Sequence, residues 1–196
     1  MGEFQIMNSL EAIAAAELVG IDALESARTL ESVGLISGRL ERVSNESDDI
    51  DVFIDYAHTP DALENIINTI DELRQACQRL IVVCGCGGDR DKTKRPVMGG
   101  MAAKMADIAI FTSDNPRTEN PEDIIREMEE GIESGDKYLK IADRHEVIKT
   151  AVMLAEPRDI ILLAGKGHED YQIIGNEKLP FNDKTIVKEY FEKFNR

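Results

Sequence analysis

The sequence contains no tryptophan, only three cysteines, and no apolar run long enough to cross a bilayer. Cys84 and Cys86 are separated by a single glycine, which does not match the paired CxxC spacing of zinc sites. We therefore expect reduced thiols that serve as packing residues, and we predict no metal site. The first residues lack the pattern of a signal peptide, so we expect a cytoplasmic protein.

Basic residues are scarce relative to acidic ones. Lys and Arg total 23 against 38 Asp and Glu, which gives a formal net charge of −15. Such a charge repels phosphate backbones and anionic lipid, so neither nucleic acid nor a membrane surface is an expected partner. Hydrophobic residues make up 42% of the chain and charged residues 31%, a balance that predicts a folded globular protein rather than a disordered one.

The chain divides into two unequal parts by pattern. Residues 1–43 predict two helices, Ile6–Leu18 and Leu24–Val33, followed by a short strand over Gly38–Val43, and this part is too small for a core of its own. The polar segment Ser44–Asp49 is predicted to be a linker. Residues 50–196 are predicted to form the main domain.

From Ile50 onward, short apolar runs alternate with amphipathic stretches, as expected for parallel strands joined by helices. One helix should begin at Thr59-Pro60 and another at Asn120-Pro121, because each pair offers a capping side chain before a first-turn proline. A late hairpin over Gly175–Leu179 and a closing helix over Lys184–Phe194 complete the prediction. The expected fold is α/β: a Rossmann-like, mostly parallel sheet with helices on both faces, preceded by a small, mainly helical fragment. The strand-forming runs are 52–54, 80–84, 108–111 and 160–164.

Polar, glycine-rich segments follow each predicted strand. Because ligands of open α/β sheets bind at the carboxyl ends of the strands, these segments predict one shared site. They are Asp55–Asp61, Gly85–Lys92, Thr112–Arg117 and Gly165–Asp170.

The residue types in these segments favour a zwitterionic or anionic ligand. Arg117 can grip a carboxylate with two parallel hydrogen bonds, and Asp114 can hold an ammonium group. Basic residues from Arg90 onward favour an anion, although Arg90 itself breaks the GxGxxG dinucleotide pattern. A solvated loop and an Asn-Pro turn with a surface arginine remain open as structural alternatives. No GxxxxGK[ST] phosphate loop occurs, and no residue is assigned a catalytic role.

Taken together, the four segments resemble the C-terminal domain of MurE-type Mur ligases, over the chain from about Ile50 to its end. The matching letters are DYAHTPDAL, GCGGDRDK, DNPR and AGKGHEDYQ. The first forty or so residues resemble the end of the central ATPase domain of that family. The resemblance implies an enzyme that uses ATP and Mg²⁺ to add meso-diaminopimelate to UDP-N-acetylmuramoyl-L-alanyl-D-glutamate, through an acyl phosphate that the amine of diaminopimelate attacks.

The resemblance also implies residue roles. Arg117 is the discriminating residue, because lysine-adding relatives have another residue there and the extra carboxylate of diaminopimelate needs a cation. The residues that match nucleotide contacts are Arg39, Asp55 and His58. The residues that match diaminopimelate contacts are Arg90, Asp114, Asn115, Pro116, Arg117, Gly165 and Glu169.

Other functions stay open at this stage. The family's phosphate loop, carbamylated lysine and uridine-nucleotide domain have no counterpart in these 196 residues, so we expect the chain alone to have little or no ligase turnover. The alternatives are a stand-alone diaminopimelate-binding or regulatory module, a lysine-adding or folylpolyglutamate synthetase relative, and a flavodoxin-like or receiver domain.

Overall fold

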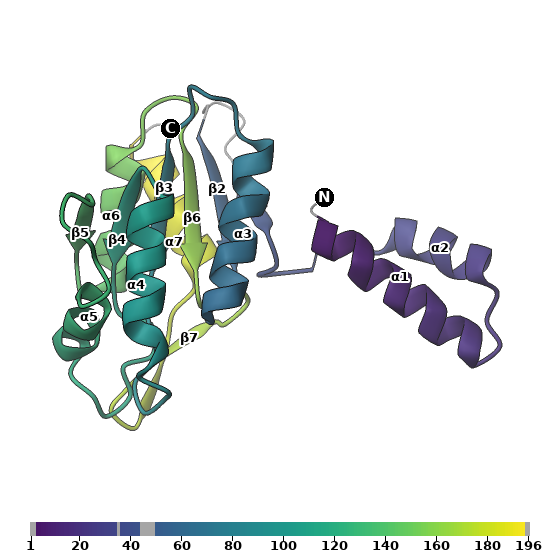
Figure 1. Ribbon diagram of the computed structural model, residues 1–196, viewed down its shortest axis with the longest axis horizontal. Coiled ribbons are helices and arrows are strands. Elements are labelled where there is room, and N and C mark those ends of the chain that lie inside the picture. Colours follow the sequence, from purple (N-terminus) through teal and green to yellow (C-terminus); the bar gives the residue numbers. More distant parts are fainter. Residues whose placement is uncertain (1–2, 35, 44–49, 195–196) are drawn as a thin grey trace. The chain divides into compact units, whose positions relative to one another are not determined.

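The computed structural model describes residues 3–34, 36–43 and 50–194 (Figure 1). The chain divides into two compact units between Ile36 and Ser37. The sequence predicted this boundary near residue 43. Strand β1 (Glu41–Val43) precedes that position but belongs to the second unit, where it pairs antiparallel with β2 (Asp51–Asp55). The predicted linker, residues 44–49, lies outside the described residues.

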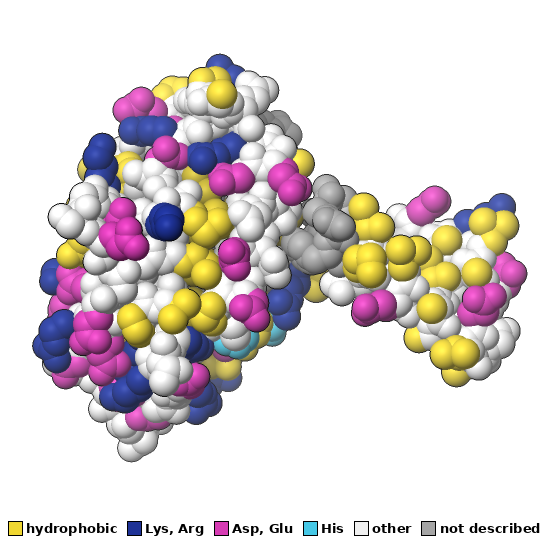
Figure 2. Space-filling model, in the orientation of Figure 1, with side chains coloured by type: hydrophobic (Ala, Val, Ile, Leu, Met, Phe, Trp, Pro, Cys, Tyr) yellow, Lys and Arg dark blue, Asp and Glu magenta, His cyan; other side chains and the backbone are white. Residues whose placement is uncertain are grey.

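The first unit contains helices α1 (Glu3–Leu18) and α2 (Ala23–Ser32), which pack against each other as a hairpin. Both helices were predicted. The Asp22 side chain caps α2 by accepting a hydrogen bond from the Glu25 amide at 3.0 Å. Among the side chains described in this unit none is buried, and hydrophobic ones cover much of its surface (Figure 2).

The second unit is built on a six-stranded sheet in the order β1-β2-β6-β3-β4-β5. All neighbours are parallel except β1 and β2. The central strands β3 and β6 are buried along their whole length, as their uninterrupted apolar runs predict. The remaining bounds are β3 Leu80–Cys84, β4 Ile108–Phe111, β5 Tyr138–Lys140 and β6 Ile160–Ala164.

Helices cover both faces of this sheet and form two separate cores (Figure 1). Side chains alternate along β3, so that Val82 joins the core under α3, α4 and α5 while Val83 joins the core under α6 and α7. The predicted Rossmann-like α/β fold is therefore confirmed. The helices are α3 Pro60–Leu73, α4 Lys94–Met105, α5 Pro121–Glu129, α6 Arg144–Leu154 and α7 Asp183–Lys193.

The predicted helix starts have the expected chemistry. Thr59 Oγ1 accepts from the Ala62 amide at 3.3 Å, and Asn120 Oδ1 accepts from the Glu122 amide at 2.9 Å. The predicted hairpin is also present, as β7 (Tyr171–Ile174) and β8 (Glu177–Pro180).

Helices α4 and α6 were not predicted from the sequence. The adjacent glycines of α4, Gly99 and Gly100, argue locally against a helix. Tertiary packing explains them: a Cβ on Gly99 would lie 2.1 Å from the Met128 carbonyl oxygen at the end of α5. The two helices can approach this closely only because those side chains are absent.

Candidate functional site

The four predicted segments meet at the carboxyl ends of the strands. The Gly88 amide donates to the Asn115 carbonyl at 2.9 Å, which joins the segments after β3 and β4. Asn115 Nδ2 donates to Glu169 Oε2 at 2.9 Å, which joins the segments after β4 and β6. The Gly165 amide donates to the Asp55 carbonyl at 3.0 Å, which brings in the segment after β2. The predicted convergence on one edge is confirmed.

Asn115 lies at the centre of this network. Its Oδ1 accepts from Lys166 Nζ at 3.2 Å and from the Ile173 amide at 2.9 Å, while its Nδ2 donates to Glu169. Lys166, fully buried, also donates to Glu169 Oε2 at 3.1 Å. Both sides of the Asn115 amide are therefore used, and its orientation is fixed. Sequence reasoning left Lys166 out of the predicted site, although it stands inside the fourth predicted segment.

Glu169 is held in its ionised form. Burial acts to raise the pKa of this carboxyl, but the hydrogen bonds from Asn115 and Lys166 outweigh burial and hold the pKa below its usual value. Tyr171 donates a further hydrogen bond to Oε1 at 3.3 Å. A half-buried carboxylate at this position can accept hydrogen bonds from an ammonium group.

Asp114 is buried directly beneath these loops. Burial raises the pKa of its carboxyl, and the positive charges of Arg144 and Lys166 oppose this only in part. A Cβ on Gly165 would lie 2.7 Å from Asp114 Oδ2, and Gly165 has φ +113°. Glycine is thus required at position 165 by both its backbone conformation and its neighbour.

Arg117 has a backbone conformation that is unusual for a non-glycine residue. Its φ is +52°, which non-glycine residues rarely adopt. Its Nη1 donates to the carbonyl oxygens of Gly88 and Asn115, at 2.9 and 3.3 Å. A two-pronged grip on a carboxylate must therefore use Nε and Nη2, the other edge of the guanidinium.

Arg90 belongs to the same glycine-rich loop as Gly87. A Cβ on Gly87 would lie 2.9 Å from Arg117 Nη1 and 3.6 Å from Arg90 Cγ, so side-chain atoms of both arginines lie close to Gly87. Arg90 is exposed and donates to the Asp89 carbonyl at 3.0 Å. Pro116 is buried, and its carbonyl oxygen would lie 1.9 Å from a Cβ on Gly88. The two loops can approach this closely only because residue 88 is a glycine.

The three residues matched to nucleotide contacts lie together beside the β2 end of the site. Asp55 accepts from the Leu40 amide at 2.7 Å and from the Ala57 amide at 2.8 Å, and burial raises the pKa of its carboxyl. The Arg39 guanidinium lies 5.2 Å from the centroid of the Tyr56 ring. Both Asp55 oxygens are engaged by main-chain amides, so this side chain holds the segment that carries Arg39.

Two histidine rings lie beside Tyr56. The Tyr56 ring centroid lies 4.7 Å from that of His58 and 5.3 Å from that of His168. The sequence analysis assigned no role to Tyr56 or His168, although each stands inside a predicted segment. Their spacing becomes meaningful only once the segments after β2 and β6 are known to be adjacent.

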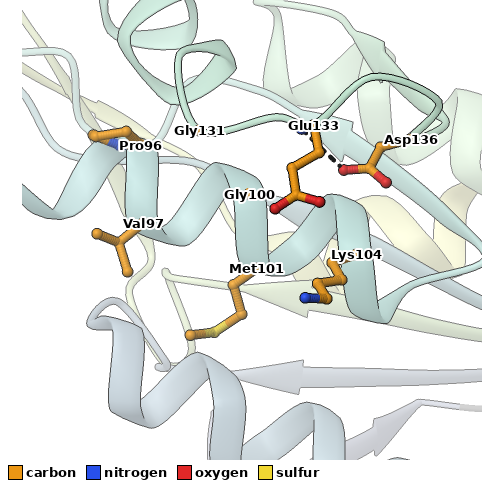
Figure 3. A pocket seen from close by; sticks show the side chains of 8 residues that line it. All are labelled: Pro96, Val97, Gly100, Met101, Lys104, Gly131, Glu133 and Asp136. Carbon is orange, nitrogen blue, oxygen red and sulfur yellow. Dashed lines mark hydrogen bonds between the residues drawn. The ribbon is translucent and has the colours of Figure 1, made fainter.

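A separate surface hollow of about 340 Å³ lies between α4 and residues 131–136 (Figure 3). Pro96, Val97 and Met101 give it an apolar floor, and the rim carries Lys104, Glu133 and Asp136. All of its lining residues differ from the predicted site residues. Within the described part of the chain no three His, Cys, Asp or Glu residues form a group that could hold a metal ion. No described helix is both long and apolar enough to cross a membrane.

The fold and the converging loops define an α/β ligand-binding domain, and comparison with known proteins places it in a family. Residues 38–167 match the family described as Mur ligase, glutamate ligase domain. The chain belongs to the Mur ligase family.

Individual relatives show which Mur ligases the chain is similar to. The UDP-N-acetylmuramoyl-L-alanyl-D-glutamate–2,6-diaminopimelate ligase 1 of Clostridium acetobutylicum is 45% identical over 98% of this chain, which spans 39% of that protein. A solved structure with the same enzyme title is 38% identical with a TM-score of 0.77, and the match covers all of this chain and 40% of that one. Escherichia coli FolC, solved in complex with ADP, shares the fold with a TM-score of 0.64 at 18% identity, over 96% of this chain and 39% of that one.

Proposed function

We propose that this chain supplies the amino-acid-binding domain of an ATP-dependent ligase that adds meso-diaminopimelate to UDP-N-acetylmuramoyl-L-alanyl-D-glutamate. The observation that supports this most is the Asn115 network, which ties Glu169 to the loop that carries Arg117. It places an ionised carboxylate and a guanidinium on neighbouring segments of one edge. A diamino diacid needs that combination.

The two charged groups divide the ligand between them. Arg117, with Arg90 also close to Gly87, would take a carboxylate, and the guanidinium edge formed by Nε and Nη2 suits a two-pronged contact. Glu169 would accept hydrogen bonds from an ammonium group. Lysine lacks the second carboxylate and would leave the arginine pair without a partner, so the site should reject it.

The residues around Tyr56 suit contact with a nucleotide. Arg39 is exposed and could meet a phosphate, while Tyr56, His58 and His168 offer ring faces. Asp55 would act by holding the segment that precedes β1. A magnesium ion would take ligands from the nucleotide phosphates and from water; the described residues contain no group of three His, Cys, Asp or Glu that could hold one by itself.

Bound ATP would supply the phosphoryl group that activates the D-glutamate side-chain carboxylate. The part played by this chain is to hold the amino acid so that its amine meets the activated carboxyl, which is a contribution of proximity and orientation. A phosphate loop has no counterpart in the 196 residues, so we expect no turnover from the chain alone. Peptide-bond formation in a single-turnover assay would contradict this.

The helical hairpin α1–α2 fits the end of a central ATPase domain of such a ligase. Its exposed apolar residues are what a helix pair presents when it belongs to a larger core. They include Ile6, Met7, Leu10, Leu18, Val19, Ile21, Leu24, Val33 and Ile36.

Isothermal calorimetry with meso-diaminopimelate and L-lysine tests the proposal directly. The chain should bind meso-diaminopimelate more tightly than lysine, and Arg117→Ala should remove that preference. Arg126→Ala removes the same charge from the exposed surface of α5 and should leave the preference intact. Equal affinity of the unsubstituted chain for the two ligands would overturn the proposed function.

A further inference from the structure

The loop that carries Arg90 and the loop that carries Arg117 are fastened together outside the binding surface. The Asp89 amide donates to Glu119 Oε1 at 2.6 Å. In return, Asp89 accepts from Thr118, through the amide at 3.2 Å and through Oγ1 at 2.7 Å. Each loop thus supplies a carboxylate to the main chain of the other.

A buried arginine, Arg95, binds Glu119 and so holds the contact between the two loops. Arg95, on α4, has a side chain that is 0% exposed, and its two terminal nitrogens each donate to one Glu119 oxygen at 2.9 Å. Arg95 Nη2 also donates at 3.1 Å to the carbonyl of Gly87, the glycine that lies close to both Arg90 and Arg117. Lys92 adds an ion pair to Glu119 at 2.9 Å. Glu119 is therefore the point where both loops and α4 meet.

Two residues of the joined loops have unfavourable backbone conformations, which the contacts of Glu119 help to hold. Asp89 has φ +54° and Arg117 has φ +52°, and both stand within two residues of a fastening contact. Non-glycine residues in this region persist only where their surroundings hold them there, and they gather at ligand sites. The two strained residues lie on the two loops that Glu119 joins.

We propose that Glu119 is a positioning residue that sets the separation of the Arg90 and Arg117 guanidinium groups, and with it the preference for an amino acid that carries a second carboxylate. The inference rests on the proposed function. Glu119 does not touch the ligand; it acts through the amide of Asp89 and through Arg95. The Gly88–Asn115 and Arg117–Gly88 hydrogen bonds would still join the two loops without Glu119. Loss of the Glu119 contacts, called the latch below, would release the tips of the loops at Asp89 and Gly87, so the two arginines would no longer meet one carboxylate together.

A purely structural ion pair would have a different signature. General loosening of the domain weakens the binding of every ligand by a similar factor. Loss of the arginine spacing weakens diaminopimelate more than lysine, because only diaminopimelate uses both guanidinium groups. The ratio of the two dissociation constants separates these cases.

The test compares Glu119→Gln with the unsubstituted chain and with Glu122→Gln, a matched loss of charge on the exposed first turn of α5. The Kd ratio of lysine to meso-diaminopimelate should fall roughly tenfold in Glu119→Gln and stay unchanged in Glu122→Gln. Amide hydrogen exchange at Asp89 and Thr118 should become faster only in Glu119→Gln. Thr118→Val, which keeps the Arg95–Glu119 pair, should lower the ratio by a smaller factor and covers the case in which Glu119→Gln does not fold.

Each outcome decides a separate point. If the unsubstituted chain prefers diaminopimelate, and Glu119→Gln and Thr118→Val both keep the full preference, the proposed role of Glu119 is wrong while the proposed function stands. An equal loss of affinity for both ligands would also contradict the positioning role of Glu119 and would show that Glu119 forms a purely structural ion pair. If the unsubstituted chain has no preference, the proposed function fails, and the role of the latch in specificity fails with it.

Discussion

Gly165 and Asp114 are two predicted site residues that lie close together. The glycine has φ +113°, and its missing Cβ leaves room for the Asp114 carboxylate. The sequence offered both residues as ligand contacts. Tertiary structure adds that they constrain each other, so that substitution of one displaces the other.

Gly165→Ala should therefore lower the free energy of unfolding and abolish amino-acid binding. Gly135→Ala is the matched control, because Gly135 has nearly the same positive φ, of +110°, but nothing lies within 4 Å of where its Cβ would stand. Backbone strain should cost either variant about 1 kcal/mol or more, and overlap with Asp114 should cost Gly165→Ala roughly 2 kcal/mol in addition. Urea denaturation measures both, and equal losses would show that the Asp114 contact is unimportant.

The protonation of Asp114 gives a second prediction at this scale. Burial raises the pKa of Asp114 above its ordinary value of 3.8. A carboxyl whose pKa is higher in the folded chain than in the unfolded chain stabilises the folded chain most at a pH below the unfolded-state pKa. That stabilisation is lost as the pH rises through the folded-state pKa. Asp114→Asn should thus gain stability relative to the unsubstituted chain as the pH is raised from about 4 to 7. Asp170→Asn, at an exposed position, should show no such trend.

Helices α6 and α7 begin side by side beneath the end of β6. Arg144, at the start of α6, donates to both carboxylate oxygens of Asp183 at the start of α7, at 3.0 and 2.8 Å, and to the Ala164 carbonyl at 3.2 Å. Arg144 and Asp183 have side chains that are 0% and 1% exposed. The pair fixes two helices to the strand that carries the Gly165–Glu169 loop.

Asp183→Ala should strongly destabilise the second unit, because it leaves the Arg144 charge buried without its partner. The expected loss is about 3 kcal/mol or more. Glu146→Ala, which removes the exposed partner of Lys149 on α6, should cost about 0.5 kcal/mol or less. Chemical denaturation of both variants measures the difference; similar midpoints would mean that the buried pair contributes no more than a surface pair.

At the scale of the whole molecule, the chain consists of a helical hairpin and a doubly covered sheet. Residues 6–36 contain no buried side chain among those described, while the second unit contains two apolar cores. Stability should therefore reside in the second unit, since burial of apolar surface is the main favourable term in folding.

A chain that begins at Ser37 should fold with the same denaturation midpoint and bind meso-diaminopimelate with the same affinity as the full chain. Circular dichroism should lose helical signal in proportion to α1 and α2 alone. A lower midpoint, or a change in affinity, would show that the hairpin contributes to the second unit.

The sequence by itself determined the described strands other than β5, most helices and the four loops of the site. Buried parallel strands require uninterrupted apolar runs, and capped helix starts require particular residues at fixed positions, so both can be recognised locally. Thr59-Pro60 and Asn120-Pro121 are examples. The glycine-rich helix α4 and the exposed strand β5 carry no such local signal.

Only the tertiary structure decided which residues meet. Lys166 reaches Asn115 across 51 positions, and Arg95 reaches Glu119 across 24. Sequence order does not encode these distances, because strand order β2-β6-β3-β4 places the last strand of the sheet between the first and second of its parallel strands. The spacing of Arg90 and Arg117, and the glutamate that holds it, follow from that arrangement.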